Sequence, residues 1–201
     1  MFVDLSVPVT AQTPVYPGDP EVRVDPVTDI DSAGYRCHRV SLGTHAGTHV
    51  DAPSHMVADG AHLDRYPVER FVGRGRYIDA RGGFALDTVQ QAGIAAGDIV
   101  VFHTGMADRY YEPSYFTDYP PLPLDIAEYL VECRVSMVGV DMCSVDYEPF
   151  AVHQTLLRGD VLILENLTGL ERVAGRDFRV YALPLRLAAD GAPVRVVAEL
   201  S

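Results

Sequence analysis

The stretch "VSMVGVDMCSVDYEPFAVHQTLLRGDVLILE", residues 135–165, has the pattern of a strand–helix–strand unit. Its two apolar runs, residues 135–140 and 161–164, have the length of buried strands. The segment between them, residues 150–157, is predicted to be a helix that ends at Gly159. Two strands joined through a helix usually lie parallel in one sheet. The stretch therefore predicts an α/β fold with a partly parallel sheet.

The same alternation continues on both sides of this unit. Residues 98–102 predict a buried strand, and residues 125–133 predict a helix. Asp87 is expected to cap a short helix that runs to Ala92 and stops at Gly93. Further strands are expected at residues 2–7, 39–42, 76–80, 178–183 and 194–199. Because no linker divides the chain, we expect one domain over residues 1–201, a mixed sheet or half-barrel with packed helices.

The charge balance argues against nucleic acid and anionic membranes as partners. The chain has 28 acidic residues against 16 Lys and Arg, a net charge of −12, whereas phosphate binding needs clustered basic residues. No apolar run approaches the ~20 residues of a membrane span, and residues 1–10 do not resemble a secretory signal. The three cysteines lack Cys-x-x-Cys spacing, so we expect reduced, mostly buried thiols in a cytoplasmic protein.

A second stretch, "THAGTHVDAPSHM" at residues 44–56, concentrates three of the seven histidines beside an aspartate. A helix would point the aspartate away from the first histidine, and Gly47 and Pro53 are poor helix residues. In an extended chain the odd-numbered positions face one side. A straight strand would still spread them over ~33 Å, so we expect bends near Gly47 and Pro53. The side chains that would then converge are those of His45, His49, Asp51 and His55.

Imidazole nitrogens and a carboxylate oxygen are suitable ligands for Zn²⁺, Mn²⁺ or Fe²⁺. Two histidines and one aspartate would leave coordination positions open, which is typical of a catalytic metal site. Three other interpretations are open at this point. The histidines could be hydrogen-bonded core or surface residues, the metal could serve a non-catalytic binding module, or Cys143 or Ser144 could act as a nucleophile.

The segment "HAGTHVDAPSHM" fits the pattern H-x-G-T-H-x-D-x-P-x-H and resembles the metal-dependent hydrolase and cyclase superfamily. That superfamily includes kynurenine formamidase, an arylformamidase, and isatin hydrolase. Three further segments carry the resemblance, and their order and spacing agree over nearly the whole chain. They are "DLSVPVTAQTPVYPGDP" at 4–20, "GVDMCSVD" at 139–146 and "HQTLLRGDVLILENLTGL" at 153–170.

The resemblance implies a swivelling β/β/α fold, a homodimer or higher oligomer, and one or two divalent ions. Zn²⁺ is the expected ion, and Mn²⁺ is the alternative. His55 would be the general acid/base. Tyr16 would contact the substrate at a position where the formamidase branch carries tryptophan. The implied metal ligands are His45, His49 and Asp51 for a first ion, and His153 and Glu165 together with a bridging Asp51 for a second.

The expected reaction is the hydrolysis of an amide, lactam or ester of a small, aromatic substrate by metal-activated water. Deformylation of N-formylkynurenine in tryptophan catabolism and the opening of isatin are the two models. A natural-product cyclase or dehydratase with the same site is the alternative enzyme. The aromatic loop at residues 109–119 is interpreted either as a lid or dimer contact, or as rings that pack the loop down.

Overall fold

The strand–helix–strand unit lies at the centre of the computed structural model, which describes residues 1–201. Its strands are β7 (Met137–Val140) and β8 (Leu162–Glu165), joined through α4 (Ala151–Arg158). The two strands are parallel, with Val138 opposite Ile163. Every residue of both strands is buried, which explains why their sequences are continuously apolar rather than alternating.

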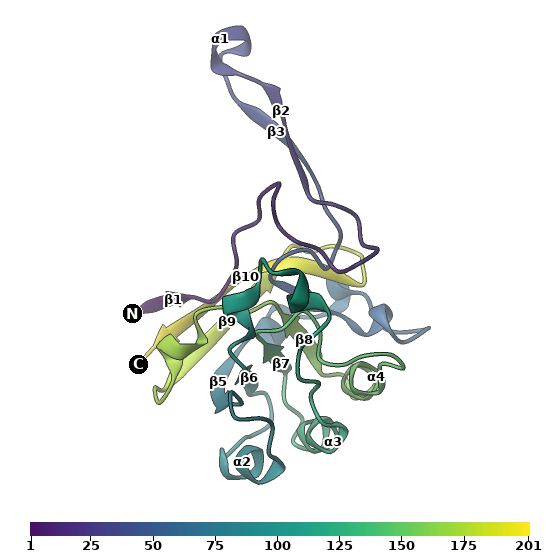
Figure 1. Ribbon diagram of the computed structural model, residues 1–201, viewed down its shortest axis with the longest axis vertical. Helices are drawn as coiled ribbons and strands as arrows, with labels where there is room; N and C mark the ends of the chain where they lie inside the picture. Colours follow the sequence, from purple (N-terminus) through teal and green to yellow (C-terminus); the bar gives the residue numbers. More distant parts are fainter.

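The parallel part of the sheet extends through β6 (Ile99–His103) and β5 (Val72–Asp79). Three helices, α2 (Leu86–Gln91), α3 (Leu124–Glu132) and α4, pack together below these strands in Figure 1. A hydrophobic cluster of 24 buried residues, which includes Phe102 and Leu156, fills the space between them. This layer is the α/β part that the alternating pattern predicts.

Antiparallel strands complete the sheet and close it on itself. They are β1 (Phe2–Asp4), β4 (His49–Asp51), β9 (Phe178–Pro184) and β10 (Gly191–Leu200). The order is β1-β10-β4-β8-β7-β6-β5-β9, and β9 also pairs with β10. The strands from β10 round to β9 therefore form a barrel-like ring, and 22 buried residues make up the second core cluster, on the other side of the sheet from the helices.

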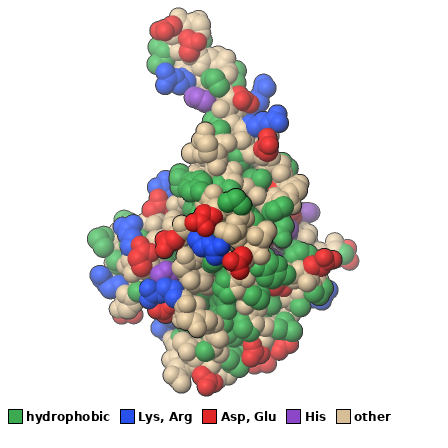
Figure 2. Space-filling model, in the orientation of Figure 1, with side chains coloured by type: hydrophobic (Ala, Val, Ile, Leu, Met, Phe, Trp, Pro, Cys, Tyr) green, Lys and Arg blue, Asp and Glu red, His purple; other side chains and the backbone are tan.

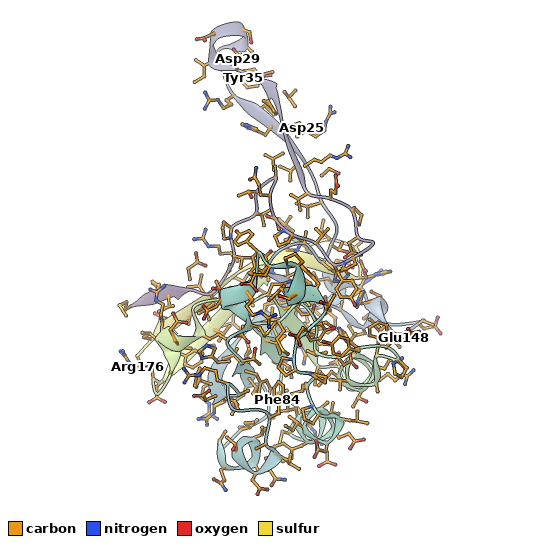
Figure 3. All side chains as sticks on the ribbon, viewed as in Figure 1. Asp25, Asp29, Tyr35, Phe84, Glu148 and Arg176 are labelled. Carbon is orange, nitrogen blue, oxygen red and sulfur yellow. The ribbon has the colours of Figure 1, made fainter.

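A separate two-stranded ribbon projects from this body (Figures 1 and 2). It consists of β2 (Arg23–Thr28) and β3 (Cys37–Ser41), with the short helix α1 (Ile30–Ala33) at its tip. We call residues 23–41 the arm. All residues of β3 are exposed, and Figure 3 places the labelled Asp29 and Tyr35 at the end of the arm far from the body. The predicted strand at 39–42 exists as β3, which begins at Cys37, ends at Ser41 and pairs with β2.

The structure differs from the predicted elements at Asp87 and in the first strand, and it contains turns that were not predicted. Asp87 does not cap α2, because the residue at the N-cap is Ala85 and Asp87 lies in the first turn, where its charge favours the helix dipole. β1 ends at Asp4, and Ser6 forms only an isolated bridge with Leu167. The connections also contain 3₁₀ turns that were not predicted: Pro53–His55, Leu63–Arg65, Val68–Phe71, Met106–Arg109, Pro113–Phe116 and Leu170–Val173.

No helix in the structure combines the length and the apolar character that crossing a membrane would require.

Candidate active site

The register between β4 and β8 places His49 directly opposite Glu165. Asp51, two residues further along β4, points to the same face because side chains alternate along a strand. Nε2 of His49 lies 3.3 Å from Oδ1 of Asp51 and 3.4 Å from Oε2 of Glu165. Strand pairing therefore builds the centre of the site from residues that are more than a hundred positions apart in the sequence.

His45 and His55 reach the same place through bends on either side of β4. Gly47 has a φ of +67°, a left-handed conformation that favours glycine, and it turns the chain between His45 and β4. Pro53 begins the 3₁₀ turn that carries His55. The rings of His45 and His55 are 4.1 Å apart between centroids. The extended interpretation is therefore right for β4 and wrong for both flanks, although the bends lie at the predicted residues.

His153 enters the site from the first turn of α4 and is held by Asp146. Its Nδ1 lies 2.5 Å from Oδ1 of Asp146, whose Oδ2 accepts a hydrogen bond from the backbone N–H of Val152. The other nitrogen, Nε2, is 3.3 Å from Oε1 of Glu165 and 4.0 Å from Oδ2 of Asp51. All predicted ligands and His55 therefore lie together, while their roles at a metal stay predictions.

Two carboxylates of the site were not predicted from the sequence as site residues. Asp146 was visible only as the end of the motif at 139–146, with no role assigned to it. Asp190, between β9 and β10, lies 2.9 Å from Nε2 of His45 and 3.4 Å from Nδ1 of His55. No sequence pattern connects Asp190 to the histidines, because it lies 145 positions after His45 and precedes glycine in what looks like an ordinary turn.

Buried side-chain atoms without hydrogen-bond partners indicate that the site fits a bound cation. Three of its side-chain atoms are buried and have no hydrogen-bond partner: Nε2 of His49, Oδ2 of Asp51 and Oε1 of Glu165. Leaving such atoms unpaired costs about 1–3 kcal/mol each, so native proteins rarely do so without a reason. Ligand atoms within 4.8 Å of one another occur in two groups that share Asp51, and these fit one cation or a pair. The first group consists of His45, His49 and Asp51. The second consists of Asp51, His153 and Glu165.

The pKa values of these side chains show how strongly the pocket favours positive charge. Burial alone would lower the pKa of His49, but Asp51 and Glu165 overcome this effect and raise it to about 10. The pKa of His153 also rises to about 10, because Asp146 and Glu165 outweigh burial. Burial would raise the pKa of Asp51, yet His49 and His45 hold it well below its ordinary value. A divalent cation would supply the same positive charge.

A cavity of about 170 Å³ opens above these polar groups. Its wall includes the apolar side chains of Pro14, Tyr16, Phe116 and Phe150. The rings of Tyr16 and Phe116 meet edge to face, with centroids 6.3 Å apart. The predicted substrate residue Tyr16 therefore lies at the cavity, whose apolar and aromatic lining suits a flat aromatic ligand.

The aromatic loop at residues 109–119 mostly packs down onto the core. Tyr110, Tyr115 and Tyr119 are buried, and the hydroxyl of Tyr115 donates to Oδ1 of Asn166 at 2.8 Å. Only Phe116 of this loop contributes to the cavity wall. The packing interpretation therefore holds for three of the rings, while Phe116 contacts the space above the site.

The cysteine and serine of "DMCSVD" are poorly placed for nucleophilic catalysis. Burial raises the pKa of the Cys143 thiol, which opposes formation of the reactive thiolate. The hydroxyl of Ser144 donates to the backbone oxygen of Asp146, 2.8 Å away, and has no imidazole partner. The expectation that the thiols are mostly buried is wrong, because Cys37 is exposed on the arm and Cys133 is partly exposed.

Comparison with known proteins agrees with the fold and with the geometry of the site. Residues 3–147 match the family model described as "Putative cyclase", so the chain is a member of that family. A curated relative, the kynurenine formamidase of Bacillus cereus, is 32% identical over 98% of this chain and 96% of its own length. These findings confirm the superfamily that the sequence motifs indicate.

Solved structures extend the comparison. An isatin hydrolase bound to the product analogue thioisatinate superimposes with a TM-score of 0.90, covering 100% of this chain and 92% of its own, at 23% identity. This likeness confirms the cyclase-like α/β fold. A structure described as a potential metal-dependent hydrolase with cyclase activity has a TM-score of 0.82 at 29% identity, covering 98% of this chain and 96% of its own.

Proposed function

We propose that this protein is a metal-dependent hydrolase that cleaves a carbon–nitrogen bond in a small aromatic amide or lactam. One observation carries the proposal: buried, unpaired ligand atoms of His49, Asp51 and Glu165 lie together, and His49 and Glu165 line a cavity with an aromatic wall. The relatives named kynurenine formamidase and isatin hydrolase support the reaction class, since both names describe hydrolysis of such bonds.

Different residues of the chain bind the ion, transfer protons and hold the substrate. His45, His49, Asp51, His153 and Glu165 would hold one or two divalent ions. When bound, such an ion lowers the pKa of water and polarises a carbonyl group. His55, at the cavity wall, takes a proton from the attacking water and returns it to the leaving nitrogen. Tyr16 and Phe116 hold the aryl group of the substrate against their rings.

Zn²⁺ is the ion we propose, with Mn²⁺ as the alternative. Three imidazoles suit Zn²⁺, while the carboxylates Asp51 and Glu165 suit either ion. The substrate range is proposed to include N-formylkynurenine and isatin. Tyr16 in place of a tryptophan leaves stacking intact but offers a smaller aromatic surface to the substrate.

Metal analysis coupled to a substrate screen tests the proposal. The purified protein should contain one or two equivalents of metal and hydrolyse N-formylkynurenine, isatin or an aryl ester. Chelation should abolish turnover, and Zn²⁺ or Mn²⁺ should restore it. Full activity after verified removal of the metal would contradict the proposal. Metal without any hydrolysis would favour the natural-product cyclase or the non-catalytic metal-binding module.

We propose that the arm joins two copies of the chain in a homodimer. An isolated two-stranded ribbon is marginally stable, and this one exposes Val27, Ile30, Tyr35 and Val40. A second copy would cover these apolar side chains.

The three free cysteines are consistent with a reducing compartment, and the cytoplasmic location stays a prediction.

A further inference from the structure

Asp190 is held in place by the backbone on both sides of the site. Its carbonyl oxygen accepts a hydrogen bond of 2.8 Å from the N–H of Ala52, and the neighbouring Ala189 accepts one from Leu63. The next residue, Gly191, begins β10 and pairs with Asp51 of β4. The main chain at Asp190 is therefore fixed relative to the strand that carries His49 and Asp51.

The side chain of Asp190 connects the two histidines that flank β4. Its Oδ2 lies 2.9 Å from Nε2 of His45 and 3.4 Å from Nδ1 of His55. Its Oδ1 accepts a hydrogen bond of 3.1 Å from the hydroxyl of Thr44. Because an aspartate can only accept when ionised, each imidazole presents an N–H toward it. For His55 the opposite nitrogen, Nε2, then carries the lone pair. For His45 the opposite nitrogen, Nδ1, carries it when a cation rather than a proton lies between Nδ1 and Asp51.

Gly191 provides the room for this arrangement. A Cβ at this position would lie 2.9 Å from Cε1 of His45 and 2.8 Å from the carbonyl oxygen of Val50. The ring of His45 therefore packs directly against the backbone of β10, between Asp190 on one side and Asp51 on the other. Its Nδ1 is 2.7 Å from Oδ1 of Asp51, within the group that could hold the first ion.

Asp190 differs from the ligand carboxylates in one respect. It forms a third three-residue group with His45 and His55, but none of its atoms is among the buried atoms without a partner. Both of its oxygens already face donors, and its side chain is 38% exposed. Asp51 and Glu165, in contrast, are almost fully buried, and each has an unpaired oxygen. This contrast favours an orienting role for Asp190 over direct ligation.

We propose that Asp190 is a positioning residue that fixes the tautomers of both histidines. Its Oδ2 accepts from Nε2–H of His45, so Nδ1 of His45 is presented to the cation. The same oxygen accepts from Nδ1–H of His55, so Nε2 of His55 is presented to the water and the leaving nitrogen. This inference rests on the proposed metal-dependent hydrolysis and adds to it a single carboxylate that couples ion binding to proton transfer.

The test compares Asp190→Asn with Asp177→Asn, a matched control. Asp177 is exposed at the opposite end of the β9–β10 hairpin, so its substitution removes the same charge without touching the site. Affinity for Zn²⁺ is measured by competition with a chromophoric chelator, and the protonated nitrogen of each histidine is read from long-range ¹H–¹⁵N spectra. Circular dichroism and thermal melting confirm that each variant is folded.

In wild type and Asp177→Asn, we expect His55 to carry its proton on Nδ1. In Asp190→Asn, Zn²⁺ affinity should fall about 10–100-fold, and the His55 signal should move toward the Nε2–H form. kcat should fall more than KM rises, and Asp190→Glu should recover part of the loss. Unchanged Zn²⁺ affinity and an unchanged His55 tautomer in folded Asp190→Asn would overturn the inference. Failure of the wild type to bind metal or hydrolyse any substrate would instead contradict the proposed function.

Discussion

At the scale of single residues, His55 is the side chain whose role is most directly testable. It lines the cavity but belongs to neither group that shares Asp51. His55→Ala should therefore retain its metal and lose about 10²–10⁴-fold in kcat, because general acid–base catalysis contributes that much. Metal content and steady-state kinetics measure the two effects separately. His38→Ala, on the arm, is the control and should leave both unchanged. An unaltered kcat in His55→Ala would remove this residue from the mechanism.

Gly191 gives a second prediction at this scale. In Gly191→Ala the new Cβ would meet the ring of His45 and the carbonyl of Val50 at less than 3 Å, so His45 must move. We expect a loss of about 1–3 kcal/mol in the free energy of unfolding and weaker Zn²⁺ binding. Gly82→Ala is a matched control, because nothing lies within 4 Å of its Cβ position. Chemical denaturation measures the free energy of unfolding, and a Zn²⁺ titration measures the affinity. Equal results for Gly191→Ala and Gly82→Ala would contradict the prediction.

Sequence reasoning reached most of the site residues, for identifiable reasons. The spacing of His45, His49, Asp51 and His55 is short enough for parity and bend-forming residues to predict convergence. His153 and Glu165 were reached only through the resemblance. The partners Asp146 and Asp190 act through a hydrogen bond to a histidine ring, and such contacts depend on strand register and side-chain direction. Neither of these can be derived from the residue types alone.

At the scale of elements, the start of β6 depends on one carboxylate shared between neighbouring strands. Asp98 is buried and accepts hydrogen bonds from the guanidinium groups of Arg74 and Arg76 on β5 and from the N–H of Ala95. Burial would raise the pKa of Asp98, but these donors hold it below its ordinary value. The carboxylate therefore stabilises the β5–β6 pair only while it is ionised.

The sign of the pH effect follows from this lowered pKa. The unfolded chain binds the proton more readily than the folded protein, so the stabilisation is fully present above the unfolded pKa near 3.8. It is lost as the pH falls through the folded value. Asp98→Asn should lower the free energy of unfolding by about 1–2 kcal/mol at pH 7, because the arginines are partly exposed, and should have less effect in acid. Urea unfolding at pH 3 and pH 7 checks this, with exposed Asp59→Asn as control.

The elements themselves were predicted with different success for physical reasons. Buried parallel strands such as β7 and β8 have continuous apolar sequences, so their positions were predicted to within about two residues. β2 was not predicted, because its residues are mostly exposed and it has only one pairing partner. Closure of the ring depends on the pairing of the β9–β10 hairpin with β5 and β4, which lie more than a hundred residues earlier, and no local pattern distinguishes it from an open half-barrel.

At the scale of the whole molecule, ion binding should stabilise the fold. A ligand at 100 times its Kd adds about 2.7 kcal/mol to the free energy of unfolding. For a chain of 201 residues this corresponds to a rise of about 5–10 °C in Tm. Differential scanning fluorimetry of the chelated protein with added Zn²⁺ or Mn²⁺ measures the shift. Glu165→Gln should show a much smaller rise, and an equal rise in both proteins would mean that the ion binds elsewhere.

The arm gives a second prediction at this scale. If it joins two copies, replacing exposed apolar side chains should weaken the dimer without unfolding the body. Ile30→Asp and Tyr35→Asp, both at the tip, should shift the mass measured by light scattering from two chains toward one. Tyr111→Asp, an exposed residue of the body, is the control. A wild-type protein that is monomeric at high concentration would contradict the proposed dimer.

The position of β10 has a consequence for how the protein folds during synthesis. This strand pairs with β1, β4 and β9, so one segment near residue 200 joins the first strand of the chain, the strand of the site and the closing hairpin. During synthesis β1 and β4 cannot pair with β10 until residues 191–200 have left the ribosome. Translation products that stop before residue 190 would therefore lack both a closed ring and Asp190 of the site, and quality-control proteases would encounter them as open chains.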